Sequence, residues 1–283
     1  MNLTDPNQIK ALMAANGVHF SKSLGQNFLI APWVPERIAE SAELNENDGV
    51  LEIGPGVGVL TRELSERAAR VLSVELDESL APILRVTLAD RPNCSVVYGD
   101  ALKQNLPELC REYFGEERAW KLCANLPYNV TTPLLTAILE SRAFETVTVM
   151  IQKEVAERIC ARAGTGEYGA FTLLVNWYAE AEKLFDVSPD CFLPQPKVTS
   201  SVIRLRRREQ PPAKVKDEGW FFKTVRAAFN QRRKALPNAL SGGLGLDKSS
   251  IVAALSELGL PADIRGERLT IEQFAELSDL LQK

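Results

Sequence analysis

The chain has 283 residues, of which 45% are hydrophobic and 25% are charged, and its formal net charge is −4. This length allows two domains or one large domain with an appendage, and the composition excludes disordered, collagen-like and disulfide-scaffold proteins. No stretch approaches the roughly 18 unbroken apolar residues of a membrane span, and the N-terminus shows no export or import signal, so a cytoplasmic location is expected.

The first half of the chain alternates short apolar runs with helical patterns. Helices are predicted over Val59–Ala69, over Ser79–Leu88 and from Thr131 onward. Such alternation is typical of βα units and predicts a doubly wound, mostly parallel Rossmann-like sheet with helices on both faces. The predicted strands are Gly49–Ile53, Arg70–Glu75, Cys94–Tyr98, Trp120–Ala124 and Phe144–Gln152.

The second half indicates a change of structure. After an apolar run at Phe171–Tyr178, Ala179–Val187 and Thr199–Arg206 are predicted to be a closing pair of strands. Gln210-Pro211-Pro212 then breaks the pattern, and from Trp220 the chain is helical. We therefore expect an α/β domain over residues 1–209 and a small all-helical domain over residues 210–283.

The cysteines and the histidine restrict which kinds of catalytic and metal site the chain can form. The five cysteines are scattered without a CxxC pair, which favours reduced core thiols over disulfides or a zinc site. His19 is the sole histidine, so catalysis by a His-Asp dyad and a metal site with two histidine ligands are disfavoured. We expect no metal, and we interpret His19 as a surface or half-buried polar residue.

Positive charge is concentrated in one segment. Between Lys197 and Lys234 there are twelve basic side chains against three acidic ones, although the chain as a whole is acidic. A run of basic residues is often just a solvated face, but this block is also what a phosphate backbone would bind.

Polar residues follow the predicted strands, where doubly wound sheets bind ligands. The first strand ends in LEIGPGVGVLT, whose alternate glycines Gly54, Gly56 and Gly58 allow a tight turn close to a ligand. A dinucleotide-binding GxGxxG motif would require a glycine at 59, where this chain has Val59. Each acid taken alone could be a helix cap or a solvated group. Together, Glu75 and Asp100 suit the ribose diol and the adenine amino group of a nucleoside cofactor.

The fourth strand is followed by Asn125-Leu126-Pro127-Tyr128. An adenine amine is a poor nucleophile, so a methylating enzyme must align it, and the side-chain oxygen of Asn125 and a backbone carbonyl are suitable acceptors while Tyr128 stacks on the base. A plain turn after a strand is the alternative interpretation.

Six motifs along the chain together resemble those of a known enzyme family. SLGQNFL (Ser23–Leu29), LEIGPGVGVLT, VELDESL, GDAL, NLPY and FLPQPKVTSSVIRL (Phe192–Leu205) resemble the motifs of the KsgA/RsmA family of ribosomal RNA adenine N6-dimethyltransferases. The resemblance spans nearly the whole chain. The wider family includes the Erm macrolide-resistance enzymes, but the tail FFKTVRAAFNQRRKALPNAL is more similar to the housekeeping, small-subunit branch.

The resemblance implies S-adenosylmethionine as cofactor and two adjacent adenosines in a hairpin loop near the 3′ end of small-subunit (16S) rRNA as substrate, each methylated twice, with a role in subunit biogenesis. Loop bases are extruded at low cost. A monomer is expected. The expected catalytic residues are Asn125, Pro127, Tyr128 and Phe192; the cofactor-binding residues are Asn27, Leu29, Gly54, Gly56, Gly58, Glu75, Asp100, Ala101 and Asn125; and the RNA-binding residues are Lys197, Arg232, Arg233 and Lys234.

Three other hypotheses remain open on the sequence. An Erm-like methyltransferase of large-subunit rRNA would share the catalytic motifs, and a ribosome assembly factor would act mainly by binding. A dehydrogenase is a third and poorer alternative, which binding of NADH would reveal.

Overall fold

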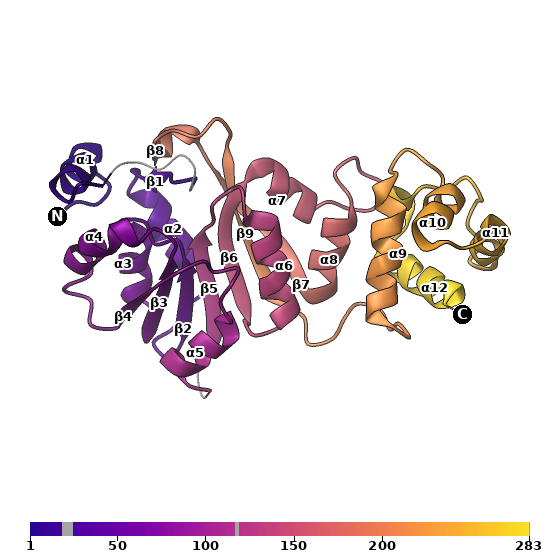
Figure 1. Cartoon of the computed structure of the whole chain (residues 1–283), viewed down its shortest axis with the longest axis horizontal. Coiled ribbons are helices and arrows are strands. Elements are labelled where there is room, and N and C mark those ends of the chain that lie inside the picture. Colours follow the sequence, from indigo (N-terminus) through magenta and orange to yellow (C-terminus); the bar gives the residue numbers. More distant parts are fainter. Residues whose placement is uncertain (19–24, 117–118, 283) are drawn as a thin grey trace. The chain divides into compact units, whose positions relative to one another are not determined.

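The structure, a computed structural model, describes residues 1–18, 25–116 and 119–282. His19, Ser23 and Leu24, which entered the sequence predictions, lie outside these ranges. The chain divides into two compact units, Met1–Ala156 with Glu180–Arg207 and Glu157–Ala179 with Arg208–Lys283. Figure 1 shows the elements of each unit. No helix in the described ranges is long and apolar enough to cross a membrane.

The first unit is organised around one main sheet, whose strands are β2 (Gly49–Ile53), β3 (Arg70–Glu75), β4 (Cys94–Tyr98), β5 (Trp120–Asn125), β6 (Thr146–Gln152), β7 (Ala179–Val187) and β9 (Ser200–Arg207). Their order is β4-β3-β2-β5-β6-β9-β7. The strands from β4 to β6 pair in parallel, and β9 pairs with β6 in antiparallel fashion. The predicted doubly wound, mostly parallel sheet is confirmed.

Helices cover both faces of this sheet. Every residue of β2 is buried, and the side chains alternate between the faces. Val50 packs into a cluster with Ile38 and Leu64, whereas a side chain at the neighbouring Gly49 would meet the ring of Phe114. The helices of these two faces are α2 (Trp33–Ser41) and α3 (Val59–Ser65) on one side and α5 (Leu106–Phe114) on the other. The remaining helical segments are α1 (Pro6–Ala15), η1 (Glu78–Leu80), α4 (Ala81–Thr87), α6 (Thr131–Ser141), α7 (Lys153–Ile159) and η2 (Pro189–Cys191).

A two-stranded ribbon joins distant parts of the first unit. Strand β1 (Phe28–Leu29) pairs antiparallel with β8 (Phe192–Leu193), so that Leu29 lies opposite Phe192. The ribbon brings Phe28 and Leu29, which end the SLGQNFL motif, next to Phe192 and Leu193, which begin the FLPQPKVTSSVIRL motif. Strands of two residues carry no periodic signal, so this pairing could not be predicted from the sequence.

The second unit is helical, as expected for the C-terminal part of the chain. It also contains residues 157–179, which the expected division after residue 209 assigned to the first domain. The reason is packing: the rings of Trp177 and Phe221 stack with centroids 4.4 Å apart, and the Tyr178 hydroxyl donates to Glu218 over 2.6 Å. Its elements are α8 (Ala170–Tyr178), α9 (Glu218–Asn230), α10 (Leu236–Leu244), α11 (Lys248–Glu257), η3 (Gly266–Arg268) and α12 (Ile271–Leu281).

Candidate active site

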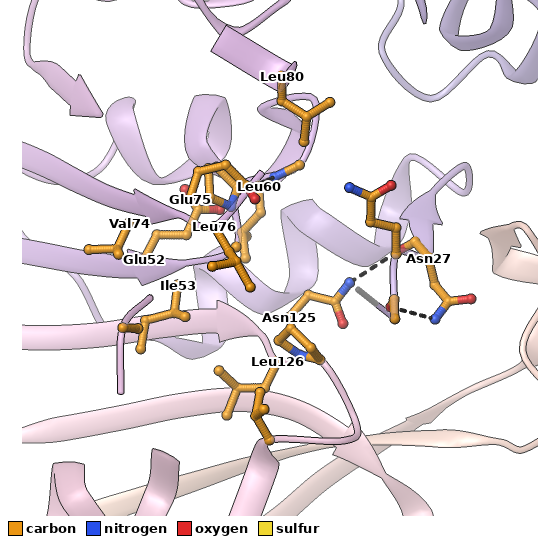
Figure 2. A pocket seen from close by; sticks show the side chains of 18 of the residues that line it. Asn27, Glu52, Ile53, Leu60, Val74, Glu75, Leu76, Leu80, Asn125 and Leu126 are labelled. Atoms are coloured by element: carbon orange, nitrogen blue, oxygen red, sulfur yellow. Dashed lines mark hydrogen bonds between the residues drawn. The ribbon is translucent and has the colours of Figure 1, made fainter. Parts of the chain in front are cut away.

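A cavity in the first unit opens at the carboxyl ends of β2, β3, β4 and β5, where the strand order reverses and such sheets bind ligands. Figure 2 shows part of its lining. The structure brings together most of the residues predicted for the site. Those that line the cavity are Asn27, Leu29, Gly54, Gly56, Glu75, Asp100, Ala101, Asn125, Pro127 and Tyr128.

The glycine loop forms one wall. Gly54, Gly56 and Gly58 all have positive φ, a conformation that side chains disfavour. A Cβ on Gly56 would lie 2.9 Å from the ring of Phe28, so this glycine also lets the N-terminal segment approach the loop. Gly58 lies directly before α3, and its Cβ position faces Thr87 of α4.

Glu75 ends β3 with its carboxylate held in place. The side chain is 6% exposed; Oε2 accepts from the Gly56 backbone nitrogen over 3.2 Å, and Oε1 accepts from the Asp77 nitrogen over 2.8 Å. Burial raises the pKa of Glu75. Because each carboxylate oxygen can accept more than one hydrogen bond, a fixed Glu75 can bind a vicinal diol.

Asp100 and two apolar side chains also line the cavity. Asp100 Oδ1 accepts from the Leu102 nitrogen over 3.0 Å. The side chains of Leu76 and Leu102 line the cavity and are 52% and 41% exposed. Large exposed apolar side chains beside a carboxylate suit a flat heterocycle with an amino group.

Glu52, the residue before Ile53 at the end of β2, is a further cavity residue that the strand pattern alone did not single out. It is 1% exposed, and its Oε2 accepts from the hydroxyls of Thr61 over 2.6 Å and Ser73 over 2.7 Å. Burial raises the pKa of Glu52 to about 7. The cavity therefore has a buried acid whose charge changes near neutral pH.

The segment Gly25–Leu29 is attached to the cavity at two points. The Gln26 side-chain nitrogen donates to Asp77 over 2.7 Å, and the Asn125 side-chain nitrogen donates to the Asn27 carbonyl over 3.3 Å (Figure 2). The ribbon with β8 continues this segment. Gln26 belongs to the SLGQNFL motif, but its bond to Asp77 spans 51 positions and has no local signal.

Asn125, the last residue of β5, and Tyr128, in the turn that follows, both line the cavity. The carbonyl of Pro127 accepts from the Val130 nitrogen and from the Thr131 hydroxyl, so Pro127 shapes the turn. The Tyr128 hydroxyl lies 2.6 Å from Ser200 Oγ. Burial raises the pKa of Tyr128, which therefore stays a neutral phenol.

Phe192 is expected to be catalytic and lies beside the cavity wall. It is 2% exposed, belongs to the hydrophobic cluster of the first unit, and is paired with Leu29. Through Leu29, which lines the cavity, it supports the N-terminal segment.

The expected RNA-binding residues are on the surface of their own units. Lys197 is exposed in the loop before β9, and Arg233 and Lys234 are exposed after α9. Arg232 donates to the carbonyls of Gly166 over 2.6 Å and Tyr168 over 2.9 Å, so it holds a loop of the second unit.

Within the described ranges, no group of three or more His, Cys, Asp or Glu side chains is placed to hold a metal ion. The polar side chains that line the cavity are carboxylates, the phenol of Tyr128 and the amides of Gln26, Asn27 and Asn125, and the rest of the wall is apolar or glycine.

Comparison with known proteins reveals relatives along the whole chain. The profile of the ribosomal RNA adenine dimethylase family matches residues 17–283. The ribosomal RNA small subunit methyltransferase A of Clostridium acetobutylicum is 48% identical over 261 residues, covering 92% of this chain and 93% of that protein. The protein of the same name from Shouchella clausii is 44% identical over 283 residues, covering 99% and 96%.

Two solved structures of methyl-transferring enzymes are also similar to this chain over most of its length. A dimethyladenosine transferase from Plasmodium falciparum matches with a TM-score of 0.73 and 25% identity, covering 88% of this chain and 95% of that one. The 23S rRNA methyltransferase ErmE matches with a TM-score of 0.68 and 31% identity, covering 90% and 99%.

Proposed function

Because this chain belongs to the ribosomal RNA adenine dimethylase family, we propose that its substrate is a pair of adjacent adenosines in the hairpin loop near the 3′ end of small-subunit rRNA. Each adenosine is dimethylated at N6, and the reaction accompanies small-subunit biogenesis in the cytoplasm. The observation that carries this proposal is that Asn125, whose side-chain oxygen is a hydrogen-bond acceptor, lines the same cavity as Glu75 and Asp100.

The cavity fits S-adenosylmethionine. Glu75, anchored by two backbone nitrogens, is suited to the ribose diol, and Asp100 with Leu76 and Leu102 is suited to adenine. We assign the methionine end to the loop around Gly54 and Gly56. When bound, the cofactor supplies an electrophilic methyl group on a sulfonium sulfur, whose departure as a thioether makes the transfer favourable.

The residues around Asn125 align the target amine. With its nitrogen bonded to Asn27, the side-chain oxygen of Asn125 is the atom that accepts from the adenine N6. The Leu126 carbonyl is the second acceptor, because that of Pro127 already accepts two bonds within the turn. Tyr128 stacks on the base, and the amine proton passes to solvent after transfer, so positioning replaces a histidine base.

The RNA contacts are assigned to the basic surface. Lys197, Arg233 and Lys234 are exposed, and cations of this kind bind phosphates without reading sequence. We propose that the helical domain holds the ribosomal partner and that the protein acts as a monomer.

The alternative target is large-subunit rRNA, favoured by the similarity to ErmE at 31% identity. Higher identity, 48% and 44%, links the chain to proteins named for the small subunit. An assembly factor acting only by binding would not need Asn125 and Tyr128 beside a cofactor cavity.

The test is transfer of labelled methyl groups from S-adenosylmethionine to unmethylated small subunits and, in parallel, to large-subunit rRNA, followed by nucleoside analysis. Dimethyladenosine only in small-subunit rRNA supports the proposal. Label only in large-subunit rRNA moves the protein to the resistance branch, and binding without label in either identifies an assembly factor.

A further inference from the structure

Tyr128 and Ser200 form a hydrogen-bonded pair that the cofactor chemistry does not explain. Their hydroxyl oxygens are 2.6 Å apart, and the residues are 72 positions apart in the sequence. Tyr128 lies in the turn after β5 and lines the cavity, whereas Ser200 is the first residue of β9 and is fully buried.

The two partners differ in how firmly the backbone holds them. Ser200 lies opposite Gln152 in the antiparallel ladder of β6 and β9, so its hydroxyl is fixed to the sheet. Tyr128 is in an irregular turn, where its ring can rotate about two side-chain torsions. A bond at the tip of the ring removes most of this freedom.

We propose that Ser200 is a positioning residue that fixes the ring of Tyr128 in the orientation in which it stacks on the target adenine. This inference rests on the proposed function, because it assumes that Tyr128 is the stacking residue. Ser200 touches neither the base nor the cofactor in this mechanism and acts through the tyrosine.

The orientation of the ring matters more for the second methyl group than for the first. An unmodified adenine amine has two N–H groups for the two acceptors, the oxygen of Asn125 and the carbonyl of Leu126. After one transfer a single N–H remains, so stacking must hold a base that has lost one hydrogen bond. Loss of the Tyr128–Ser200 bond should therefore impair the second transfer more than the first.

The neighbouring serine is a matched control. Ser201 is also fully buried, and its hydroxyl donates to Asp186 over 2.6 Å. Adjacent residues of a strand point to opposite faces, and Asp186 is further bound by Lys153 and Lys183. Ser201→Ala thus removes a serine hydrogen bond of the same length from the next position of β9 without touching Tyr128.

The experiment compares Ser200→Ala, Ser201→Ala, Tyr128→Phe and the Ser200→Ala/Tyr128→Phe double variant on unmethylated small subunits. We expect kcat to fall about three- to tenfold in Ser200→Ala and Tyr128→Phe, with unchanged KM for S-adenosylmethionine and accumulation of monomethyladenosine. The double variant should be no slower than the single ones, because all three lose the same bond. Ser201→Ala should keep the wild-type rate and product ratio.

Two outcomes separate this inference from the proposed function. If Ser200→Ala and Tyr128→Phe both match Ser201→Ala in rate and product ratio, the positioning role is wrong. Tyr128→Ala, which removes the ring, is assayed beside these variants, and if it keeps full transfer, the stacking role itself is wrong. Tyr128→Phe keeps the ring and changes only the hydroxyl, so the test does not depend on how well Ser200→Ala folds.

Discussion

The side-chain nitrogen of Asn125 lies 3.3 Å from the backbone carbonyl of Asn27, and this contact determines which end of the amide can serve the substrate (Figure 2). An amide has one donor end and one acceptor end. Because the donor end is bonded to the N-terminal segment, the acceptor end is available for the amine of the target base.

Replacement of this amide should therefore separate catalysis from binding. Asn125→Asp cannot donate to the Asn27 carbonyl and places a negative charge beside it, so we expect methyl transfer to fall about 100-fold or more. Binding to small subunits should be retained in a filter-binding assay. Asn129→Asp, an exposed change in the same turn, should keep normal transfer. Undiminished transfer by Asn125→Asp would contradict the assigned role.

Glu75 should contribute mainly to cofactor affinity. Glu75→Gln keeps the size of the side chain but replaces one acceptor oxygen by a donor, and hydrogen bonds to a charged group contribute about 1.5–3 kcal/mol. We expect the Kd for S-adenosylmethionine to rise about 10- to 100-fold in isothermal titration calorimetry. The exposed Glu78→Gln is the control. Equal affinities for both variants would remove Glu75 from the cofactor site.

The glycine loop can be tested by adding a single methyl group. Gly56→Ala combines a φ of +59° with a Cβ 2.9 Å from the Phe28 ring, whereas Gly17→Ala has a φ of +69° but no described atom within 4 Å. Both should lose about 1 kcal/mol of unfolding free energy from backbone strain. Only Gly56→Ala should also weaken cofactor binding, because the N-terminal segment must move. The measurement is the Kd for S-adenosylmethionine of both variants, which separates the steric effect of the added methyl group from the effect of backbone strain. Equal Kd values would show that the close approach of Phe28 to the glycine loop does not contribute to cofactor binding.

Burial of Glu52 predicts a stability that falls as pH rises. Its pKa is about 7 in the folded protein against 4.5 for an ordinary glutamate, so between these values the unfolded chain has released a proton that the folded chain retains. Ionisation above pH 7 then costs the fold about 3 kcal/mol. Glu52→Gln should match the wild type near pH 4.5 and exceed its stability at pH 8, as measured by urea unfolding of ligand-free protein. A variant less stable than the wild type at pH 8 would show that the charge is compensated.

The basic residues after α9 should differ in role, one stabilising the fold and the other two binding RNA. Arg232 is bonded to the carbonyls of Gly166 and Tyr168, so Arg232→Ala should lower the melting temperature of the protein. Arg233→Ala and Lys234→Ala should instead reduce the salt dependence of RNA binding, by about 1 in the log–log slope for each phosphate that is no longer neutralised. An unchanged slope in the Arg233/Lys234 double variant would exclude this segment from the RNA interface.

Most of the main sheet could be predicted from sequence. The bounds of β2, β3, β4 and β7 agree with the prediction. Strands β2, β3 and β4 show as apolar and β-branched runs because they are buried or partly buried, whereas β7 has exposed charged residues between its buried ones. In contrast, β6 begins at Thr146 and not at Phe144, which is buried just before the strand. The ribbon of β1 and β8 was missed, because its register is set by pairing between distant segments and not by local pattern.

The residues of the candidate site also fall into those that the sequence could predict and those that it could not. Glu75, Asp100 and Asn125 could be predicted, because each lies at the end of a strand or directly after one, and parallel strands end at one edge of the sheet. Ser200 and Gln26 could not be assigned roles, because their partners Tyr128 and Asp77 lie far away in the sequence. The packing of α8 on α9 was missed for a similar reason, since the stacked rings of Trp177 and Phe221 join segments that are separated in the sequence by the three strands β7, β8 and β9.

The ribbon also imposes an order of events during synthesis. Phe28 and Leu29 leave the ribosome early, but their partners Leu193 and Phe192 emerge more than 160 residues later. Until then Phe28 and Leu29 have no partner strand, although β2 to β6 can already pair and Gln26 and Asn27 can already bind Asp77 and Asn125. A nascent chain should therefore gain protection from proteolysis by S-adenosylmethionine only after Leu193 has emerged, which makes enclosure of the cofactor one of the last steps in the folding of the first unit.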